Sequence, residues 1–241
     1  MTRPGNQAKR SGLGSSVRFV AEVIPLFPLS HVLLPGMPLP LHIFEPRYRQ
    51  LLQDVRAGAD LGRFGVVVLH SGSEAGPHAG PPDIADIGTL AEIIEVEPGD
   101  DGSSDLLAVG SRRFRVGALL TDGAPYLRGE VEWLAEDDGD VRPGHVPVTR
   151  RLCGDLRELL EALTGQARSD DPPSDATLLS YHVAAQLPLG TDDRQALLAA
   201  PTTADRLLLA VALLRRELRL LQSTRSVAVA PSAFRLPASP N

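Results

Sequence analysis

The hydrophobic pattern of the chain changes once along its length. In the first half, apolar and charged residues alternate, as where Phe114 and Val116 stand against Arg113 and Arg115; this period of two is typical of strands with one buried face. In the second half, leucines recur three and four residues apart, which is typical of amphipathic helices. Strands followed by helices predict an α+β fold with segregated layers.

Four segments of the first half are predicted to be strands. They are Phe64 to Leu69, Thr89 to Glu97, Leu106 to Val116 and Leu127 to Trp133. The first is apolar at odd and even positions alike, so we expect both of its faces to be covered. In the second, Ile94 and Val96 alternate with glutamates and are expected to share the buried face. Gly99 to Gly102 is predicted to turn the chain back as a hairpin.

Four helices are predicted in the second half. The apolar stripe of the first consists of Val148, Leu152, Leu156, Leu159 and Leu163, and that of the second of Leu178, Leu179, His182 and Val183. Thr191, followed by two aspartates, is expected to cap the third helix. The fourth is predicted to start at Thr202 or Thr203, and its stripe consists of Leu207, Val211, Leu214, Leu218 and Leu221.

The segment Ile24 to Val55 is punctuated by prolines and then turns helical. Five prolines before Phe44 exclude a helix and an uninterrupted central strand there. The sequence Leu34-Pro35-Gly36-Met37 predicts a type II turn, because proline presets the first torsion and glycine takes the positive one. A helix is expected from Pro46 to about Gly58.

Composition divides the chain into five expected segments. They are a disordered leader (1–18), a β-rich subdomain (19–135), an acidic linker (136–146), a helical bundle (147–222) and a flexible tail (223–241).

Charge and cysteine content narrow the class of protein. The 241 residues carry 24 basic and 30 acidic side chains, a net charge of −6, so nucleic acid is not an expected partner. Cys153 is the single cysteine and cannot form an intramolecular disulfide. The chain opens without a secretory signal pattern, and its longest apolar run, Leu207 to Leu214, is too short to span a membrane. We therefore expect a cytoplasmic protein that does not bind membranes.

Several strings occur together in a characteristic order and resemble one known family. They are IPLFPL, LPGM, LPLHIFEPRY, FGVVVL, GTLAEIIEVE, GSRRFRV and LPLGTDDRQALLAAPTTADRLLLAVALLRRELRLL, between Val23 and Leu221. The chain resembles the substrate-binding, N-terminal domain of the ATP-dependent Lon proteases, as a stand-alone bacterial member. The resemblance implies a twisted, partly barrel-like, PUA-like β subdomain with one embedded helix, followed by a helical bundle. It also implies recognition of polypeptide substrates.

These 241 residues contain none of the sequence motifs expected of the ATPase and peptidase parts of a complete Lon protease. No glycine-rich phosphate loop ending in Gly-Lys-Ser/Thr is present, and Lys9 is the only lysine, so a packed serine-lysine dyad is not expected. We therefore expect a non-enzymatic protein without a cofactor, which acts as an adaptor, a competitor or a holdase for client proteins. A separate ATP-dependent protease is a second expected partner. RNA or small-ligand binding, which the PUA-like resemblance implies, is the alternative.

The sequence gives weaker support to two other candidate sites, a cysteine nucleophile and a set of metal ligands. Cys153 with His145 or His182 has the residue types of a nucleophile and base, but a cysteine beside a helix stripe is expected to act as a small hydrophobe. A hydrolase would need such a site. A second set, His70, His78, Asp83 and Asp86, lacks the spacing of a zinc site. We expect no metal.

Charged residues of the β-rich half are expected to be structural. His42 and Glu45 flank Phe44 and are not expected to be a catalytic pair. Arg112, Arg113 and Arg115 form the densest basic cluster, with pairing to Glu130 and Glu132 favoured over phosphate binding. Glu45 is a candidate anchor for Arg113 across the sheet.

The candidate polypeptide-binding surface is the proline corner. It comprises Leu33, Leu34, Pro35, Met37 and Pro38. If the corner is exposed, its apolar side chains mark an interaction site, and methionine suits a permissive one. The alternative is that the corner folds over the sheet and completes the core.

Overall fold

A computed structural model describes residues 22–58, 62–71, 82–120, 123–165, 171–187 and 189–224. The expected leader, most of the expected tail and most of the loop after Ser71 lie outside these ranges. The strands are β1 (Glu22–Leu29), β2 (Pro38–Ile43), β3 (Arg63–Ser71), β4 (Asp83–Ile84), β5 (Ile87–Pro98), β6 (Ser104–Leu120) and β7 (Arg128–Trp133). The helices are α1 (Pro46–Ala57), α2 (His145–Thr164), α3 (Ala176–Gln186), α4 (Thr191–Ala199) and α5 (Thr203–Thr224).

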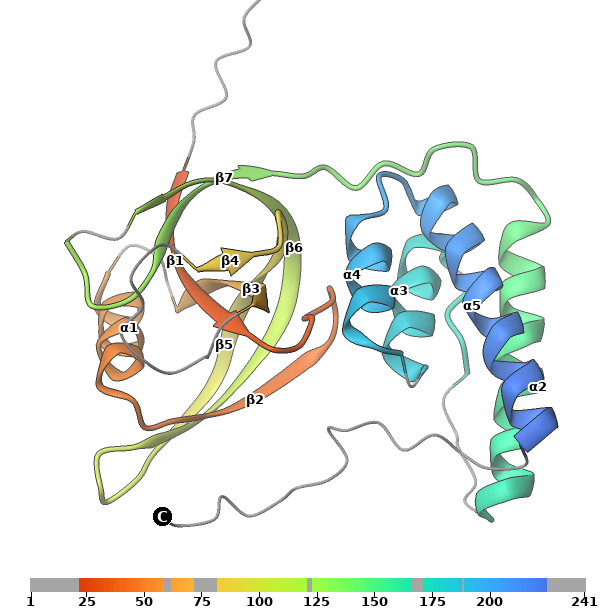
Figure 1. The fold of residues 1–241 in the computed structure, drawn as a ribbon, viewed down its shortest axis with the longest axis horizontal. Coiled ribbons are helices and arrows are strands. Elements are labelled where there is room, and N and C mark those ends of the chain that lie inside the picture. The colour runs from red at the N-terminus through yellow and green to blue at the C-terminus, as the bar shows by residue number, and fades with distance from the viewer. Residues whose placement is uncertain are drawn as a thin grey trace, which may run out of the picture.

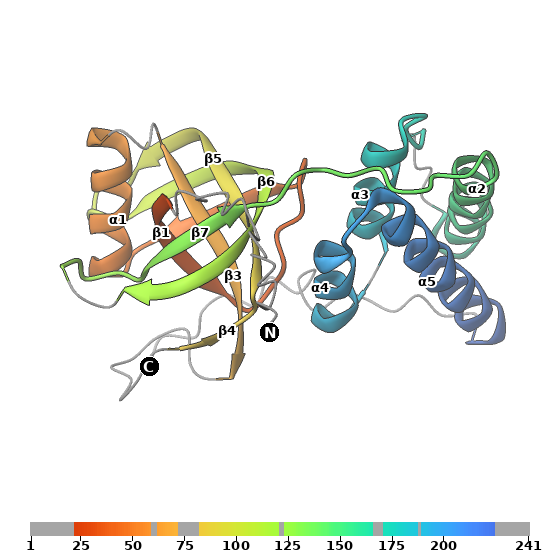
Figure 2. The same cartoon turned by 90° about the horizontal axis from the view of Figure 1, so that it is seen from above.

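The strands close into a barrel, and the helices of the second half form a separate layer beside it (Figures 1 and 2). Antiparallel pairings run from β1 through β7, β6 and β5 to β3, and a parallel pairing of β3 with β1 completes the ring. Strand β2 pairs with β6 off this ring, and β4 pairs with β3. The predicted α+β architecture, with a barrel-like β part followed by a helical part, is confirmed.

Strand β1 tolerates two prolines because it changes partner halfway along. Its first four residues pair with β7, and its last four pair with β3. Pro25 and Pro28 therefore each belong to a half with one ladder, where a missing N–H group is tolerated. Strand β1 is thus paired on one side at a time, in keeping with the prediction that the prolines exclude an uninterrupted central strand.

Helix α1 covers one end of the barrel (Figure 1). It starts at Pro46, as predicted, and buries Tyr48, Leu51, Leu52 and Val55. Tyr48 stacks on Phe27 of β1, with ring centroids 3.9 Å apart, and Phe27 lies 5.9 Å from Phe64 of β3. This aromatic contact fixes the helix on the barrel.

The helical layer differs from the predictions at two stripe residues and one cap residue. Val148 and Leu178 are 40% and 60% exposed, so placing them on buried stripes was wrong. Thr191 is the first residue of α4 and makes no capping hydrogen bond there; its hydroxyl donates to the Ser30 carbonyl at 3.4 Å. The capping role is therefore wrong for Thr191. No helix of the described residues is long and apolar enough to cross a membrane.

The helical layer shares a core with the barrel. Val32, Leu34, Val68 and Ile87 of the β part belong to the same buried cluster as the leucines of α2 to α5. Gln195 of α4 donates from Nε2 to the Ile87 carbonyl at 2.9 Å. The two halves thus bury apolar surface against each other.

Candidate functional site

The proline corner is built into this shared core. The predicted type II turn is present: Gly36 has a φ of +78°, and the Met37 amide donates to the Leu34 carbonyl at 3.0 Å. Leu33 and Leu34 are 2% and 0% exposed, Pro35 and Met37 are half-buried, and Pro38 is exposed. The expectation that the corner presents exposed leucines was wrong for both.

The corner is buried because it lies between β6 and the helices. The Gly36 amide donates to the Gly110 carbonyl at 2.8 Å, and the Gly110 amide donates to the Met37 carbonyl at 3.0 Å. A Cβ atom at Gly110 would lie 2.3 Å from the Leu34 carbonyl oxygen, so only glycine permits this approach. Leu34 then fills the core shared with the helices. Any binding role of the corner falls to Pro35, Met37 and Pro38, for which it stays a prediction.

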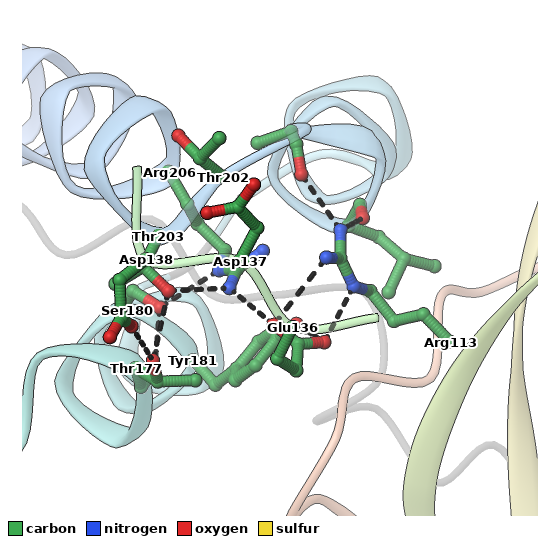
Figure 3. A network of polar contacts seen from close by, with 12 residues as sticks. Arg113, Glu136, Asp137, Asp138, Thr177, Ser180, Tyr181, Thr202, Thr203 and Arg206 are labelled. Carbon is green, nitrogen blue, oxygen red and sulfur yellow. Dashed lines mark hydrogen bonds and ion pairs between the residues drawn. The ribbon is translucent and has the colours of Figure 1, made fainter. Parts of the chain in front are cut away.

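A polar network joins the barrel to the helices at Glu136, in the connection between β7 and α2 (Figure 3). Its Oε1 accepts from Arg113 Nε at 2.8 Å and from Tyr181 Oη at 2.8 Å. Its Oε2 accepts from Arg206 Nη2 at 2.9 Å. Arg113 and Arg206 are 2% and 0% exposed. One carboxylate therefore pairs with two buried guanidinium groups from different halves of the molecule.

Both arginines have further partners. Arg113 Nη1 donates to the carbonyls of Leu198 and Ala200 at 2.8 and 2.7 Å, at the C-terminal end of α4, where a cation complements the helix dipole. Arg206 lies over the Tyr181 ring at 4.1 Å and donates from Nε to Ser180 Oγ at 2.8 Å. These contacts give the network a structural role, and Arg206 Nη1 remains a buried nitrogen without a hydrogen-bond partner among the described residues.

The environment of Glu136 keeps it ionised. Burial opposes ionisation of this carboxyl, but the hydrogen bonds from Tyr181 and Arg113 and the charges of Arg113 and Arg206 outweigh burial and hold its pKa below the ordinary range. Burial in the same cluster raises the pKa of Tyr181, which stays protonated and donates. The predicted anchor between Glu45 and Arg113 was wrong, because Glu45 instead pairs with Arg47 at 2.8 Å.

The segment expected to be a linker is also held by main-chain bonds. The carbonyls of Asp137 and Asp138 accept from the amides of Thr203 and Ala204 at 2.8 and 3.1 Å. These amides are at the start of α5, where no intrahelical partner exists. Thr202 Oγ1 accepts from the Asp205 amide at 3.1 Å. The connection thus completes the helix start and fixes α5 relative to the barrel.

A groove with a volume of about 630 Å³ lies on the outer face of β2, β5 and β6. Its lining residues are Pro40, Leu41, His42, Glu95, Glu97, Asp105, Leu106 and Leu107. Register places Pro40 opposite Leu107 and Leu107 opposite Glu95, so three strands contribute neighbouring side chains. The three strands that carry the groove belong to the barrel, and α2 lies on the far side of the helical layer from it (Figure 1).

A β-bulge adds apolar surface beside this groove. The register of β5 against β6 shifts between Ile93 and Glu95. Ile94 is consequently 63% exposed, while Ile93 and Val96 pack toward the barrel core. Expecting Ile94 to share the buried face was therefore wrong, because an extra residue reverses the alternation. Phe44, 59% exposed, follows the groove residue His42 at a ring distance of 6.0 Å.

The basic cluster of β6 is used for pairing. Arg115 Nη1 donates to Glu132 Oε2 at 3.1 Å, as predicted. Arg112 lies over the Trp133 ring at 4.5 Å. Arg113 pairs with Glu136, and its expected pairing with Glu130 or Glu132 was wrong. The sequence did not predict the pairing of Glu136 with Arg113 and Arg206. The nearest signal was the acidic composition of the expected linker (136–146), which precedes a helix.

The geometry does not support a nucleophile at Cys153. Burial raises the pKa of its thiol to about 11, and the half-buried side chain packs against the helical core. His145 Nδ1 instead accepts from the Arg142 amide at 3.3 Å. Of the residues considered as metal ligands, His78 lies outside the described ranges. His42 and Asp105 form an exposed pair at 2.8 Å.

Comparisons with known proteins agree with the fold. The family model described as the ATP-dependent protease La (LON) substrate-binding domain matches residues 23–216. The crystal structure of a Lon N-terminal domain protein from Xanthomonas campestris is 32% identical, with a TM-score of 0.58, and the match covers 79% of this chain and 98% of that one. The N-terminal domain of the Mycobacterium avium complex Lon protease has a TM-score of 0.60 at 17% identity, covering 80% and 98%, which shows similarity of fold.

Curated relatives are longer proteins. Lon protease 2 of Syntrophobacter fumaroxidans is 28% identical over 202 residues, which are 81% of this chain and 24% of that protein. Lon protease of Escherichia coli strain K12 is 27% identical over 213 residues, 85% of this chain and 26% of that protein. The chain thus spans about a quarter of the length of these relatives.

Proposed function

Because the chain belongs to the Lon substrate-binding domain family, we propose that it is a recognition module that binds unfolded polypeptide segments in the groove of β2, β5 and β6. The observation that carries this proposal is the exposed apolar surface at the groove. Leu107 lines it, and Phe44 and Ile94 flank it with exposed fractions of 59% and 63%. Exposed apolar side chains around a concave surface are typical of an interaction site.

The proposed activity requires no chemistry by this chain. It holds clients as a binding protein, and it acts as an adaptor, a competitor or a holdase for a separate ATP-dependent protease. RNA is disfavoured as the ligand, because the lining carboxylates Glu95, Glu97 and Asp105 repel a phosphate backbone.

The test compares folded and unfolded forms of one protein. Reduced, carbamidomethylated ribonuclease A and native ribonuclease A have the same sequence and net charge and differ only at their cysteines, so a difference in Kd reports recognition of the unfolded chain. We expect the unfolded form to bind and the native form to bind at least about tenfold more weakly, since burying a single apolar side chain is worth about 1.5–3 kcal/mol. Equal binding of both forms would contradict the proposal.

Matched variants locate the surface. Phe44→Gln with Leu107→Gln should weaken binding about 30-fold, because partly exposed side chains of this size contribute about 2 kcal/mol together. Leu178→Gln with Leu208→Gln removes two leucines that are 60% and 55% exposed on the helical layer, and should leave Kd unchanged. Met37→Gln tests the corner. If Met37→Gln or the helical control abolishes binding while the groove variant does not, the groove is not the site.

A further inference from the structure

We infer that the groove selects cationic segments, in which Lys or Arg side chains accompany apolar ones on the same face of an extended chain. This inference rests on the proposed function and specifies its substrate class. It follows from three features of the groove: the sign of its charges, the lack of partners for two of its carboxylates, and the prolines on its edge strand.

The charges that line the groove are of one sign. Glu95, Glu97 and Asp105 are exposed acidic residues, and none of the lining residues is Lys or Arg. His42 is the one lining residue that can carry a positive charge, and it pairs with Asp105 at 2.8 Å. An occupant with positive charges beside apolar groups is therefore complementary to this surface.

Two of the carboxylates lack partners. Within the described part of the chain, neither Glu95 nor Glu97 takes part in an ion pair or side-chain hydrogen bond. Register places Glu97 directly opposite Asp105 on the neighbouring strand. Like charges at directly opposed positions destabilise a sheet. A ligand cation placed between them would relieve this repulsion.

Some carboxylates of the barrel outside the groove do have a polar partner. Glu132 pairs with Arg115 at 3.1 Å, and Glu45 pairs with Arg47 at 2.8 Å. Glu22 accepts from the Trp133 indole at 2.7 Å. The groove differs from the rest of the barrel in that three acidic residues line one concave surface with no Lys or Arg among the lining residues.

The edge of the groove favours side-chain recognition over strand addition. Among the described strands, β2 pairs with β6 alone, and Pro38 and Pro40 give it no N–H group at two of its six positions. A peptide added along this edge would find too few donors for a regular ladder. At the β2 edge an occupant is therefore expected to bind through side chains, and every second side chain of an extended segment laid across the face points at the groove.

The test uses three peptides with identical apolar positions and Lys, Gln or Glu at the intervening ones, measured by fluorescence anisotropy with the full chain. We expect the Lys peptide to bind about fivefold more tightly than the Gln peptide, as two exposed ion pairs allow, and the Glu peptide to bind most weakly. The preference for Lys should shrink as salt is raised. Glu95→Gln with Glu97→Gln should bring the Lys peptide to the affinity of the Gln peptide.

The control for net charge is Asp155→Asn with Glu158→Gln, which changes the total charge equally on α2, a helix that lies on the side of the helical layer away from the barrel (Figure 2). It should keep the Lys preference. If all three peptides bind equally, or if the α2 control loses the preference as fully as the groove variant, charge selection is refuted while polypeptide binding stands. If no peptide binds, the proposed function itself fails, and the inference fails with it.

Discussion

Replacing Glu136 by Gln should destabilise the protein more than any surface substitution, because one carboxylate serves two buried arginines. The change preserves shape but removes the charge that faces Arg113 at 2.8 Å and Arg206 at 2.9 Å. Breaking a buried ion pair costs about 3–5 kcal/mol. Glu136 is itself 37% exposed, so solvent screens part of the loss and we expect about 3 kcal/mol.

Urea unfolding followed by circular dichroism measures this loss, and it corresponds to a fall in Tm of about 6–12 °C. The matched control is Glu132→Gln, whose carboxylate pairs with Arg115 at 3.1 Å while 40% exposed. An exposed pair of this kind contributes about 0.2–1 kcal/mol. If Glu136→Gln and Glu132→Gln lose the same free energy of unfolding, the two halves are not held together by Glu136.

Three further outcomes follow from burial and charge. Because the pKa of Glu136 lies below that of an unfolded glutamate, its contribution to the free energy of unfolding is complete above about pH 4.3 and is lost as the pH falls through the lower folded pKa. The free energies of unfolding of wild type and Glu136→Gln, measured against pH, should therefore converge below about pH 4. Curves that stay parallel down to acid pH would contradict this. Leu34→Ala should lower the free energy of unfolding, measured in urea, by about 2–5 kcal/mol, since Leu34 is fully buried. Pro38→Ala, at an exposed position, should lower it by less than about 1 kcal/mol. Equal losses would show that the corner is not part of the core. With a thiol pKa of about 11, Cys153 should react with iodoacetamide at pH 8 roughly a hundredfold more slowly than a free cysteine, and reaction at the free rate, followed by mass spectrometry, would place it in solvent.

Local signals were sufficient for much of the fold. Pro46 fixed the start of α1, and Gly36 fixed the turn after Pro35, because both depend on the torsions of single residues. The alternation around Phe114 and the leucine spacing of α5 depend on the nearest few residues. These features do not require knowledge of the tertiary structure.

The site depends on long-range contacts, which the sequence does not encode locally. The bulge after Ile93 is set by the partner strand β6, and it reversed the expected orientation of Ile94. Arg113 finds Glu136, 23 residues away, instead of the nearer Glu130 or Glu132 on β7. Leu34 is covered by helices that follow more than a hundred residues later. The possibility that the two leucines of the corner are exposed was therefore wrong, and the groove was not anticipated.

Hydrogen exchange with and without a saturating Lys-containing apolar peptide tests the central claim most directly, because it locates the bound segment on the chain. Binding in the groove predicts slower exchange in β2 (Pro38–Ile43) and in the hairpin formed by β5 (Ile87–Pro98) and β6 (Ser104–Leu120), with α2 and α5 unchanged. Protection confined to the helices, or no protection at a peptide concentration that saturates binding, would contradict it.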